Sequence, residues 1–272
     1  MTVLVTGATG NVGRHVVAGL LRAGERVRAM TRSPRSAALP AEVDVVRGDL
    51  ADAASLDAAL AGVDKAYLFP LPGTAEGFTE RAVKAGVRRI VVLSSVSAEY
   101  ADGDYSGDHH TAVERAVEAS GLEWTHIRSG EFMANLLSWW APTIRAENAV
   151  RAPFGAVRST PVHEADIADV AVAALLEERH VGKAFSFAGP ESLTKHEQVR
   201  VLGEVLGRAV RFEELTVDEA RALWLGQGMP VEAVDWLLQD PVDVPVGPTA
   251  ERVTGRPGRT FAQWVADHRA DF

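Results

Sequence analysis

Three glycines close to the N-terminus constrain this chain more than any other feature. Gly7, Gly10 and Gly13 follow a short apolar run, residues 3–5, and precede a segment whose apolar residues recur with helical spacing. In such a strand–turn–helix unit, the first glycine allows a sharp turn and the second leaves room for a pyrophosphate beside the backbone. The third lets helix and strand pack closely. Backbone N–H groups at the start of the helix can then bind the anion. The stretch predicts a dinucleotide site.

The residues of this turn are the first expected cofactor contacts, namely Gly7, Thr9, Gly10, Asn11, Val12 and Gly13. An ordinary glycine-rich turn is the alternative. The place of the three glycines, after a strand and before a helix, favours the dinucleotide site. The fold expected around it is a Rossmann-type α/β domain with a doubly wound parallel sheet.

Composition narrows the classes of partner. The chain has 272 residues, a net charge of −9 and no cysteine. Without a basic cluster, nucleic acid is not an expected partner. The absence of cysteine excludes disulfides and thiolate catalysis, and it fits a reducing cytosol. No apolar run approaches the roughly 20 residues that span a bilayer, and the N-terminus does not resemble a signal peptide. We expect a cytoplasmic protein that does not enter membranes.

The end of the second expected strand, residues 25–31, indicates which cofactor binds. An NAD-preferring site places an acid about 20 residues beyond the glycines, where it holds the ribose 2′-hydroxyl. This chain has Arg32 and Ser33 there instead. A guanidinium pairs with a 2′-phosphate, which an acid would repel. The sequence therefore predicts NADP (NADPH), although a solvated surface arginine is the alternative; Arg14 and Arg35 are possible helpers.

Further strands are expected at residues 43–47, 61–72 and 88–98. The second of these ends at Phe69 and Pro70, and ligands in this fold lie at the carboxyl ends of strands, so both residues are expected to cover the cofactor. A helix over residues 74–85 should end at Gly86.

The glycine motif and several later segments resemble the NmrA-like branch of atypical short-chain dehydrogenases/reductases. The motif TGATGNVG is followed by His110-x-x-x-Glu114, by a Ser-Gly-Leu-x-Trp-Thr run, by Ile127-Arg128 and by the stretch 162–171. The resemblance spans about residues 2–195 in the same order. It implies that Asp49 and Leu50 lie beside the adenine, with a helix-capping role for Asp49 as the alternative. It also implies that Ser94 contacts the cofactor and Ser95 the substrate, with turn capping as the alternative.

The usual Tyr-x-x-x-Lys pair of short-chain reductases is incomplete here. Tyr105 is present in what the sequence predicts to be a glycine-rich loop, but the lysine position holds His109. Several members of the branch, including NADPH-dependent quinone reductases, lack the pair. The resemblance then implies direct hydride delivery to an electron-poor acceptor. His110 and Tyr105 are the candidate catalytic residues, because imidazole and phenol can supply a proton. Hydrogen bonding to the helix start or to a ribose hydroxyl is the alternative role for the histidine.

An aromatic-rich segment follows the strand at 123–128. The spacing of Phe132, Leu136, Trp139 and Trp140 places them on one helical face. Core packing is one interpretation, and a flat apolar pocket for a planar or aromatic substrate is the other. The expected substrate contacts here are Phe132, Asn135, Trp139 and Trp140. The acidic stretch 162–171 could suggest a metal, but its apolar periodicity favours a helix capped by Asp166, so no metal is expected.

We expect a dinucleotide-binding domain at residues 1–133 and 156–189 and a smaller substrate or cap portion at 134–155 and 190–272. The expected function is an NADPH-dependent oxidoreductase of the short-chain type, transferring hydride to a conjugated carbonyl, quinone-like or imine molecule. The alternatives are a non-catalytic NADP-binding sensor and a non-redox enzyme, for rearrangement or cyclisation, on the same fold. A monomer or homodimer is expected.

Overall fold

The computed structural model describes residues 1–100, 103–239 and 243–272 and divides them into two compact units. The first comprises Met1–Ser129, Glu164–Ser186 and Val253–Gly255. The second comprises Gly130–His163, Phe187–Arg252 and Arg256–Phe272. The division differs from the expected one, because residues 130–133, 156–163 and 187–189 lie in the second unit and residues 253–255 lie in the first. Hydrogen bonds explain the difference: Gly130 N–H donates to Phe187 O, and Met133 N–H donates to Val162 O.

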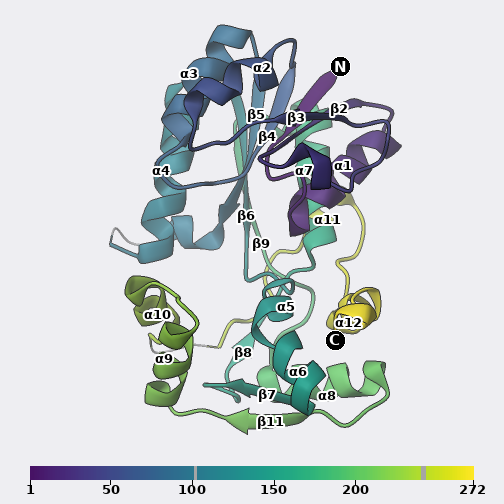
Figure 1. Ribbon diagram of the computed structural model, residues 1–272, viewed down its shortest axis with the longest axis vertical. Helices are drawn as coiled ribbons and strands as arrows, with labels where there is room; N and C mark the ends of the chain where they lie inside the picture. Colours follow the sequence, from purple (N-terminus) through teal and green to yellow (C-terminus); the bar gives the residue numbers. More distant parts are fainter. Residues whose placement is uncertain (101–102, 240–242) are drawn as a thin grey trace. The chain divides into compact units, whose positions relative to one another are not determined.

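A seven-stranded sheet forms the centre of the first unit (Figure 1). Its strands are β1 (Thr2–Val5), β2 (Arg26–Thr31), β3 (Asp44–Arg47), β4 (Lys65–Leu68), β5 (Arg89–Ser95), β6 (Glu123–Ser129) and β9 (Lys183–Phe187). The order is β3-β2-β1-β4-β5-β6-β9, and each neighbouring pair from β3 to β6 runs parallel. The strand order reverses direction beside β1, which is where a doubly wound sheet binds its ligand.

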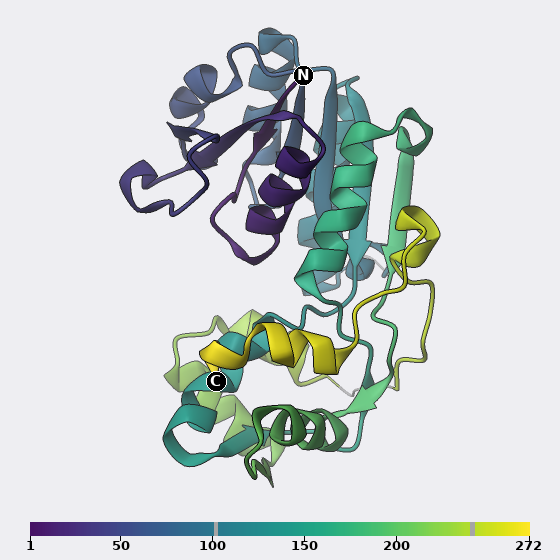
Figure 2. The same cartoon turned by 90° about the vertical axis from the view of Figure 1, so that its right-hand side faces the viewer.

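Helices cover both faces of this sheet (Figures 1 and 2). One face carries α2 (Leu56–Leu60), α3 (Ala75–Ala85) and α4 (Tyr105–Ala119), with 3-10 turns η2 (Ala53–Ser55) and η3 (Val96–Glu99). The other carries α1 (Asn11–Arg22) and α7 (Glu164–Leu176). The remaining short turns are η1 (Pro34–Ser36) and η4 (Glu178–His180). Gly86 ends α3 in the left-handed conformation, as the sequence predicts.

Two buried cations at the starts of β4 and β5 hold the end of α7. Lys65 and Arg89 are register partners on the parallel strands, and their side chains are at most 2 % exposed. Lys65 Nζ donates to Leu175 O at 2.6 Å, and Arg89 also donates to the last carbonyls of the helix. The positive charges thus satisfy carbonyls that a helix end leaves without partners.

The second unit has its own small strands and helices. They are α5 (Asn135–Trp139), α6 (Ala141–Glu147), β7 (Ala149–Ala152), β8 (Arg158–Ser159), β10 (Leu193–Thr194), α8 (Lys195–Leu206), β11 (Arg211–Glu214), α9 (Val217–Gly226), α10 (Val231–Leu237), α12 (Phe261–Asp267) and η5 (Arg269–Asp271). A further helix, α11 (Glu251–Thr254), crosses the division of the units. β7 pairs parallel with β11, and β8 pairs antiparallel with β10. Thr194 caps α8 in a reciprocal box with Glu197.

A hydrophobic core joins α5, α6, α8 and α12 within this unit. Trp264 is fully buried and stacks on Phe261, and Trp140, Ile144 and Leu202 belong to the same cluster. In the ranges that the structure describes, every helix is too short or too polar to traverse a lipid bilayer.

Candidate active site

The glycine turn after β1 is tightly packed. Gly7 adopts φ +59°, a left-handed conformation that favours glycine. A Cβ on Gly13 would lie 2.1 Å from the Gly7 carbonyl oxygen, so only glycine allows α1 to start this close to the turn. Gly10 N–H donates to Gly7 O at 2.9 Å and closes the loop. The first and third glycines therefore have the structural roles that the sequence predicts.

The N-terminus of α1 is open to an anion. Its N-cap is Gly10, no side chain caps it, and its first turn has no acidic residue. Asn11, Val12 and Gly13 form this first turn, so their N–H groups lie at the positive end of a helix of 12 residues. Arg14 folds back and donates to the carbonyls of Thr9 and Gly10. The backbone and charge of this turn fit a dinucleotide pyrophosphate.

Thr6 connects the ends of β1 and β4 by hydrogen bonds. The sequence alone did not indicate this role. Its buried hydroxyl donates to Tyr67 O at 3.1 Å and accepts from Phe69 N–H at 2.7 Å. The bond holds Phe69 against the glycine turn, where a Cβ on Gly7 would lie 3.3 Å from Phe69 Cβ. Phe69 itself is 44 % exposed, so its ring is available beside the turn. Pro70 follows it in a tight turn, in which Leu71 N–H donates to Phe69 O.

Arg32 and Ser33 lie directly beyond β2, and both are exposed. Ser33 N–H is held by the Thr31 hydroxyl, which fixes the backbone at the strand end. Across the described residues, Arg32 makes no ion pair with a carboxylate that would neutralise it, and this leaves its guanidinium available for a phosphate.

Asp49 forms a local turn after β3. Its carboxylate accepts from Ala51 N–H at 3.0 Å, while the cap of the following η2 is Asp52. The helix-capping interpretation of Asp49 is therefore wrong, because Asp52 caps the following helical turn. Leu50 beside it is 9 % exposed and belongs to the core of the unit.

Ser94 is part of a buried polar network at the ends of β5 and β6. Its hydroxyl donates to Glu114 Oε1 at 2.6 Å, and Arg128 contacts both oxygens of the same carboxylate. These bonds lower the pKa of Glu114 although its burial acts in the opposite direction. Glu99 also accepts from Arg128 and from Ser186. The single hydroxyl proton of Ser94 is thus already used inside the protein. An acid on an otherwise apolar helix face, between Val113 and Val117, is the sequence signal for this network.

Ser95 ends β5 and caps η3, in line with the turn-capping alternative. Its oxygen accepts from Ser97 N–H at 3.2 Å and from the Ser97 hydroxyl at 2.8 Å. Ser97 in turn lies 2.8 Å from the Ser106 hydroxyl on the first turn of α4. Sequence reasoning missed both Ser97 and Ser106.

Tyr105 lies on a helix, and its assignment to a loop was wrong. Asp104 caps α4 by accepting from Gly107 N–H, so the helix begins at Tyr105 and runs through both histidines. One turn later, His109 makes an edge-on contact with the Tyr105 ring, with centroids 4.8 Å apart. Tyrosine and histidine thus occupy the two positions of a Tyr-x-x-x-Lys pair and contact each other.

His110 is half-buried on the same helix, one turn before Glu114. Its Nδ1 is buried and finds no hydrogen-bond partner among the described residues. Burial lowers the pKa of His110, which the nearby Glu114 only partly offsets. The neutral imidazole is therefore the main form at neutral pH, and it can offer a hydrogen bond more readily than a proton.

Comparison with known proteins agrees with this geometry. A family model described as NAD(P)H-binding matches residues 7–178. The chain belongs to this NAD(P)H-binding family. A (4-alkanoyl-5-oxo-2,5-dihydrofuran-3-yl)methyl phosphate reductase from Streptomyces griseus is 41% identical over 99% of both chains. An NAD(P)H azoreductase from Xenophilus azovorans is 34% identical, also over 99% of both. The solved NADPH complex of an Escherichia coli NADPH-dependent quinone oxidoreductase matches with a TM-score of 0.78 and 25% identity, over 97% of this chain and 99% of that one.

This NAD(P)H-binding protein thus falls among NAD(P)H-dependent oxidoreductases, in the NmrA-like branch of atypical short-chain dehydrogenases/reductases. The remaining expected site residues lie in its second unit. Trp140 is 3 % exposed and belongs to that unit's core, so core packing is the correct interpretation for it. Phe132 lies outside any helix, in a short bridge with Val162, and so does not share a helical face with Trp139. Asn135 begins α5, and its side chain, like that of Trp139, is half-buried.

The acidic stretch 162–171 forms the start of α7. The helix begins at Glu164, so the buried Asp166 lies inside its first turn and is not the cap that the sequence predicts. His163 contacts Asp267 at 3.3 Å. Among the residues that the structure describes, no group of three or more His, Asp or Glu side chains is arranged to hold a metal ion.

Proposed function

We propose that this protein is a cytoplasmic, NADPH-dependent reductase that delivers hydride to a conjugated carbonyl or a related electron-poor acceptor. The observation that carries the proposal is the open, acid-free start of α1 behind a glycine turn that only glycine can form. A dinucleotide held there extends along the carboxyl ends of the parallel strands. The full-length likeness to two reductases supports the same class of reaction.

The proposed cofactor is NADPH, with Arg32 as the contact of its 2′-phosphate. Arg32 is exposed at the end of β2, and neither Thr31 nor Ser33 beside it carries a charge that would repel the phosphate. Gly7 and Thr9–Gly13 are the proposed pyrophosphate contacts. Asp49 and Leu50 are proposed beside the adenine, and Phe69 and Pro70 over the turn.

Chemistry shared by the relatives supports the proposed acceptor. Their names specify an alkanoyl-substituted oxo-dihydrofuran, an azo compound and a quinone. Each contains a conjugated, electron-poor double bond that accepts a hydride without prior protonation by a strong acid. A helix with histidine in place of the lysine of the Tyr-x-x-x-Lys pair is compatible with such acceptors. We therefore expect planar conjugated substrates.

Bound NADPH supplies the hydride. The protein's own part is to fix the strand ends and to hydrogen-bond the acceptor. The Ser94–Glu114–Arg128 network fixes the ends of β5 and β6 against α4. Tyr105 and the neutral His110 are proposed as hydrogen-bonding contacts of the acceptor at the start of that helix. Ser95, Phe132, Asn135 and Trp139 are proposed as further substrate contacts.

The test is NADPH oxidation by the purified protein with a panel of enones, quinones, imines and azo compounds, after calorimetry with NADPH and NADH. We expect tighter binding of NADPH and turnover with at least one conjugated acceptor. Binding without turnover on any acceptor would contradict the reductase and favour a sensor or a non-redox enzyme.

A further inference from the structure

We propose that three serine hydroxyls form a directed proton relay, from Ser106 through Ser97 to Ser95, with Ser95 as the last donor to the acceptor's oxygen. The inference rests on the proposed reductase function and identifies the proton source of that reaction. All three residues lie in the first unit, at the end of β5, in η3 and on the first turn of α4.

The hydrogen bonds set the direction of the chain. Ser97 donates both its N–H and its hydroxyl proton to Ser95 Oγ, which fills the two acceptor positions of that oxygen. Having given its only proton to Ser95, Ser97 must accept from Ser106 at 2.8 Å. In the described part of the chain no acceptor is found for the Ser95 proton. The chain therefore ends in a free donor, and each of its bonds points that way.

The surroundings hold the three hydroxyls rigidly. Ser97 is 2 % exposed, while Ser95 and Ser106 at the two ends are half-buried. A Cβ on Gly107 would lie 2.5 Å from Ser97 O, so glycine is what allows α4 to approach η3 this closely. Asp104 fixes the same turn by accepting from Gly107 N–H. A buried link between two solvent-accessible ends is the arrangement that a relay requires.

The place of Ser95 matches the reacting end of the site. Ser95 is the last residue of β5, and ligands of such sheets bind outside the carboxyl ends of the strands. Ser94 beside it cannot serve in the same way, because its proton is bound to Glu114. Ser129, the register partner of Ser95 on β6, is 1 % exposed, and its hydroxyl has no partner among the described residues. Of these three serines, Ser95 alone combines access with a hydroxyl proton that no described residue accepts.

The chemistry balances with one proton from solvent. The hydride of NADPH, which becomes NADP⁺, brings the electron pair of the acceptor's new C–H bond, and the π electron pair that it displaces moves through the conjugated system to the acceptor's oxygen. That oxygen takes the Ser95 proton as the Ser97 proton moves to Ser95 and the Ser106 proton moves to Ser97. Water then returns a proton to Ser106. No residue has to carry a net charge after the cycle, so no imidazolium or lysine is required.

The kinetic test compares the single-turnover rates at which four variants oxidise NADPH with the best acceptor. Ser95→Ala should slow hydride transfer about 100-fold, since it removes a donor at the developing oxyanion. Ser106→Ala should slow it about tenfold and make a curved proton inventory in D₂O mixtures linear, and Ser106→Thr should restore both. The matched control is Ser129→Ala, which should leave the rate unchanged. NADPH affinity should be the same in all four.

A second readout is independent of turnover, because the natural chain has no cysteine. The single thiol of Ser95→Cys should react with a disulfide reagent, and saturating NADPH should protect it. Its pKa should lie below that of an ordinary thiol, because Ser97 donates a hydrogen bond to it. The thiol of Ser129→Cys should hardly react. A Ser95→Cys thiol that NADPH does not protect, or a Ser95→Ala enzyme at full rate, would overturn the relay alone. A wild-type protein that binds NADPH but reduces no acceptor would overturn the reductase proposal, and the relay with it.

Discussion

Arg32 is an exposed cation directly beyond β2, where we propose that it binds the 2′-phosphate of NADPH. Replacing it in Arg32→Asp should weaken NADPH binding about 10–100-fold, because one charge-assisted hydrogen bond is lost and a repulsion is gained. NADH binding should change little or improve. Calorimetry with both dinucleotides measures this. Arg26→Asp, the same charge change at the opposite end of β2, is the control and should affect neither; equal NADPH affinity in Arg32→Asp would refute the phosphate contact.

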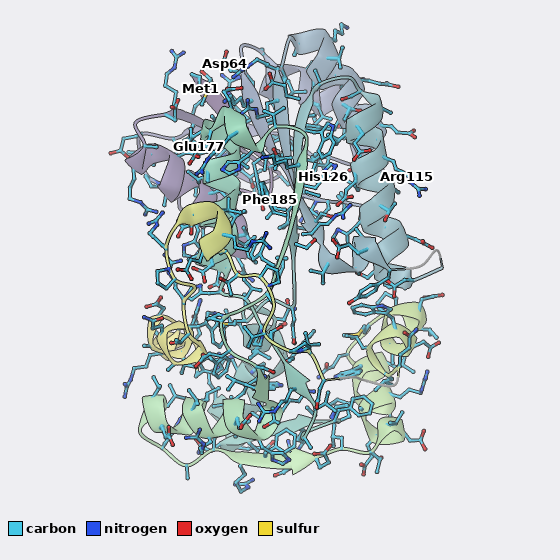
Figure 3. The ribbon with its side chains drawn as sticks, turned by 180° about the vertical axis from the view of Figure 1, so that it is seen from behind. Met1, Asp64, Arg115, His126, Glu177 and Phe185 are labelled. Carbon is cyan, nitrogen blue, oxygen red and sulfur yellow. The ribbon has the colours of Figure 1, made fainter. Side chains whose placement is uncertain are left out.

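His126 lies fully buried on β6, stacked on Trp124 and 3.0 Å from Glu118 on α4. Figure 3 shows it on the side of the sheet that faces α4, whereas Arg115 points outward from that helix. Burial lowers the pKa of His126, and the nearby glutamates only partly offset this. The unfolded chain therefore binds the proton more tightly than the folded one.

The contribution of His126 to the unfolding free energy is therefore fully present above the ordinary histidine pKa of about 6.5. It is lost as the pH falls from there towards the lowered pKa of His126 in the folded protein. His126→Gln, which can keep the bond to Glu118, should reduce this acid-induced loss in unfolding free energy by about 1 kcal/mol. Urea titrations above and below that pH measure it. The exposed His196 provides the control, since His196→Gln should leave the loss as it is; an unaltered loss in His126→Gln would disprove the assignment.

At the scale of elements, α7 depends on cations outside itself. Arg89 donates to carbonyls at the helix end and pairs with Glu123 and Glu178. Arg89→Met should lower the unfolding free energy by about 3–5 kcal/mol. It removes the hydrogen-bond donor of the buried carbonyls at the helix end and the positive charge that pairs with Glu123 and Glu178. Arg88→Met is the matched control: Arg88 pairs with the same two glutamates but is 50 % exposed, so its loss should be below about 1 kcal/mol. Equal effects of the two substitutions in urea unfolding would contradict the capping role.

The elements that the sequence predicts well are those whose signal is local. The first strand, the glycine turn and α1 form as predicted, and so does α3 with its Gly86 cap. Prediction fails where a distant contact decides. Phe132 pairs with Val162 instead of continuing a helix. The start of α4 was missed at Tyr105 because the Asp104 cap stands in a stretch rich in helix-breaking residues.

The candidate site shows the same limit. The cofactor turn could be predicted from three glycines because their spacing is a property of one short segment. The Ser94–Glu114–Arg128 network and the Ser106–Ser97–Ser95 chain each join elements that are separate in sequence. Single serines carry no periodic signal, and Glu114 on an otherwise apolar helix face indicates a buried acid without identifying its partners. Only the fold brings them together, so the sequence could not predict either group.

At the scale of the whole molecule, the chain leaves the first unit after Ser129 and returns at Glu164. β7 and β11, about 60 residues apart, pair within the second unit, a contact that no local pattern predicts. The full-length likeness to reductases covers both units, so the activity is expected of the entire chain and not of the dinucleotide unit alone.

The most direct test of the central claim follows the hydride itself. NADPH carrying deuterium at either the 4R or the 4S position of the nicotinamide is incubated with the protein and a conjugated enone, and the product is analysed by mass spectrometry and NMR. We expect one of the two labelled forms to place a single deuterium on a product carbon, and the second hydrogen added to the acceptor to come from water. Reduced product without deuterium from either form, or no reduction of any conjugated acceptor by protein that binds NADPH, would contradict it.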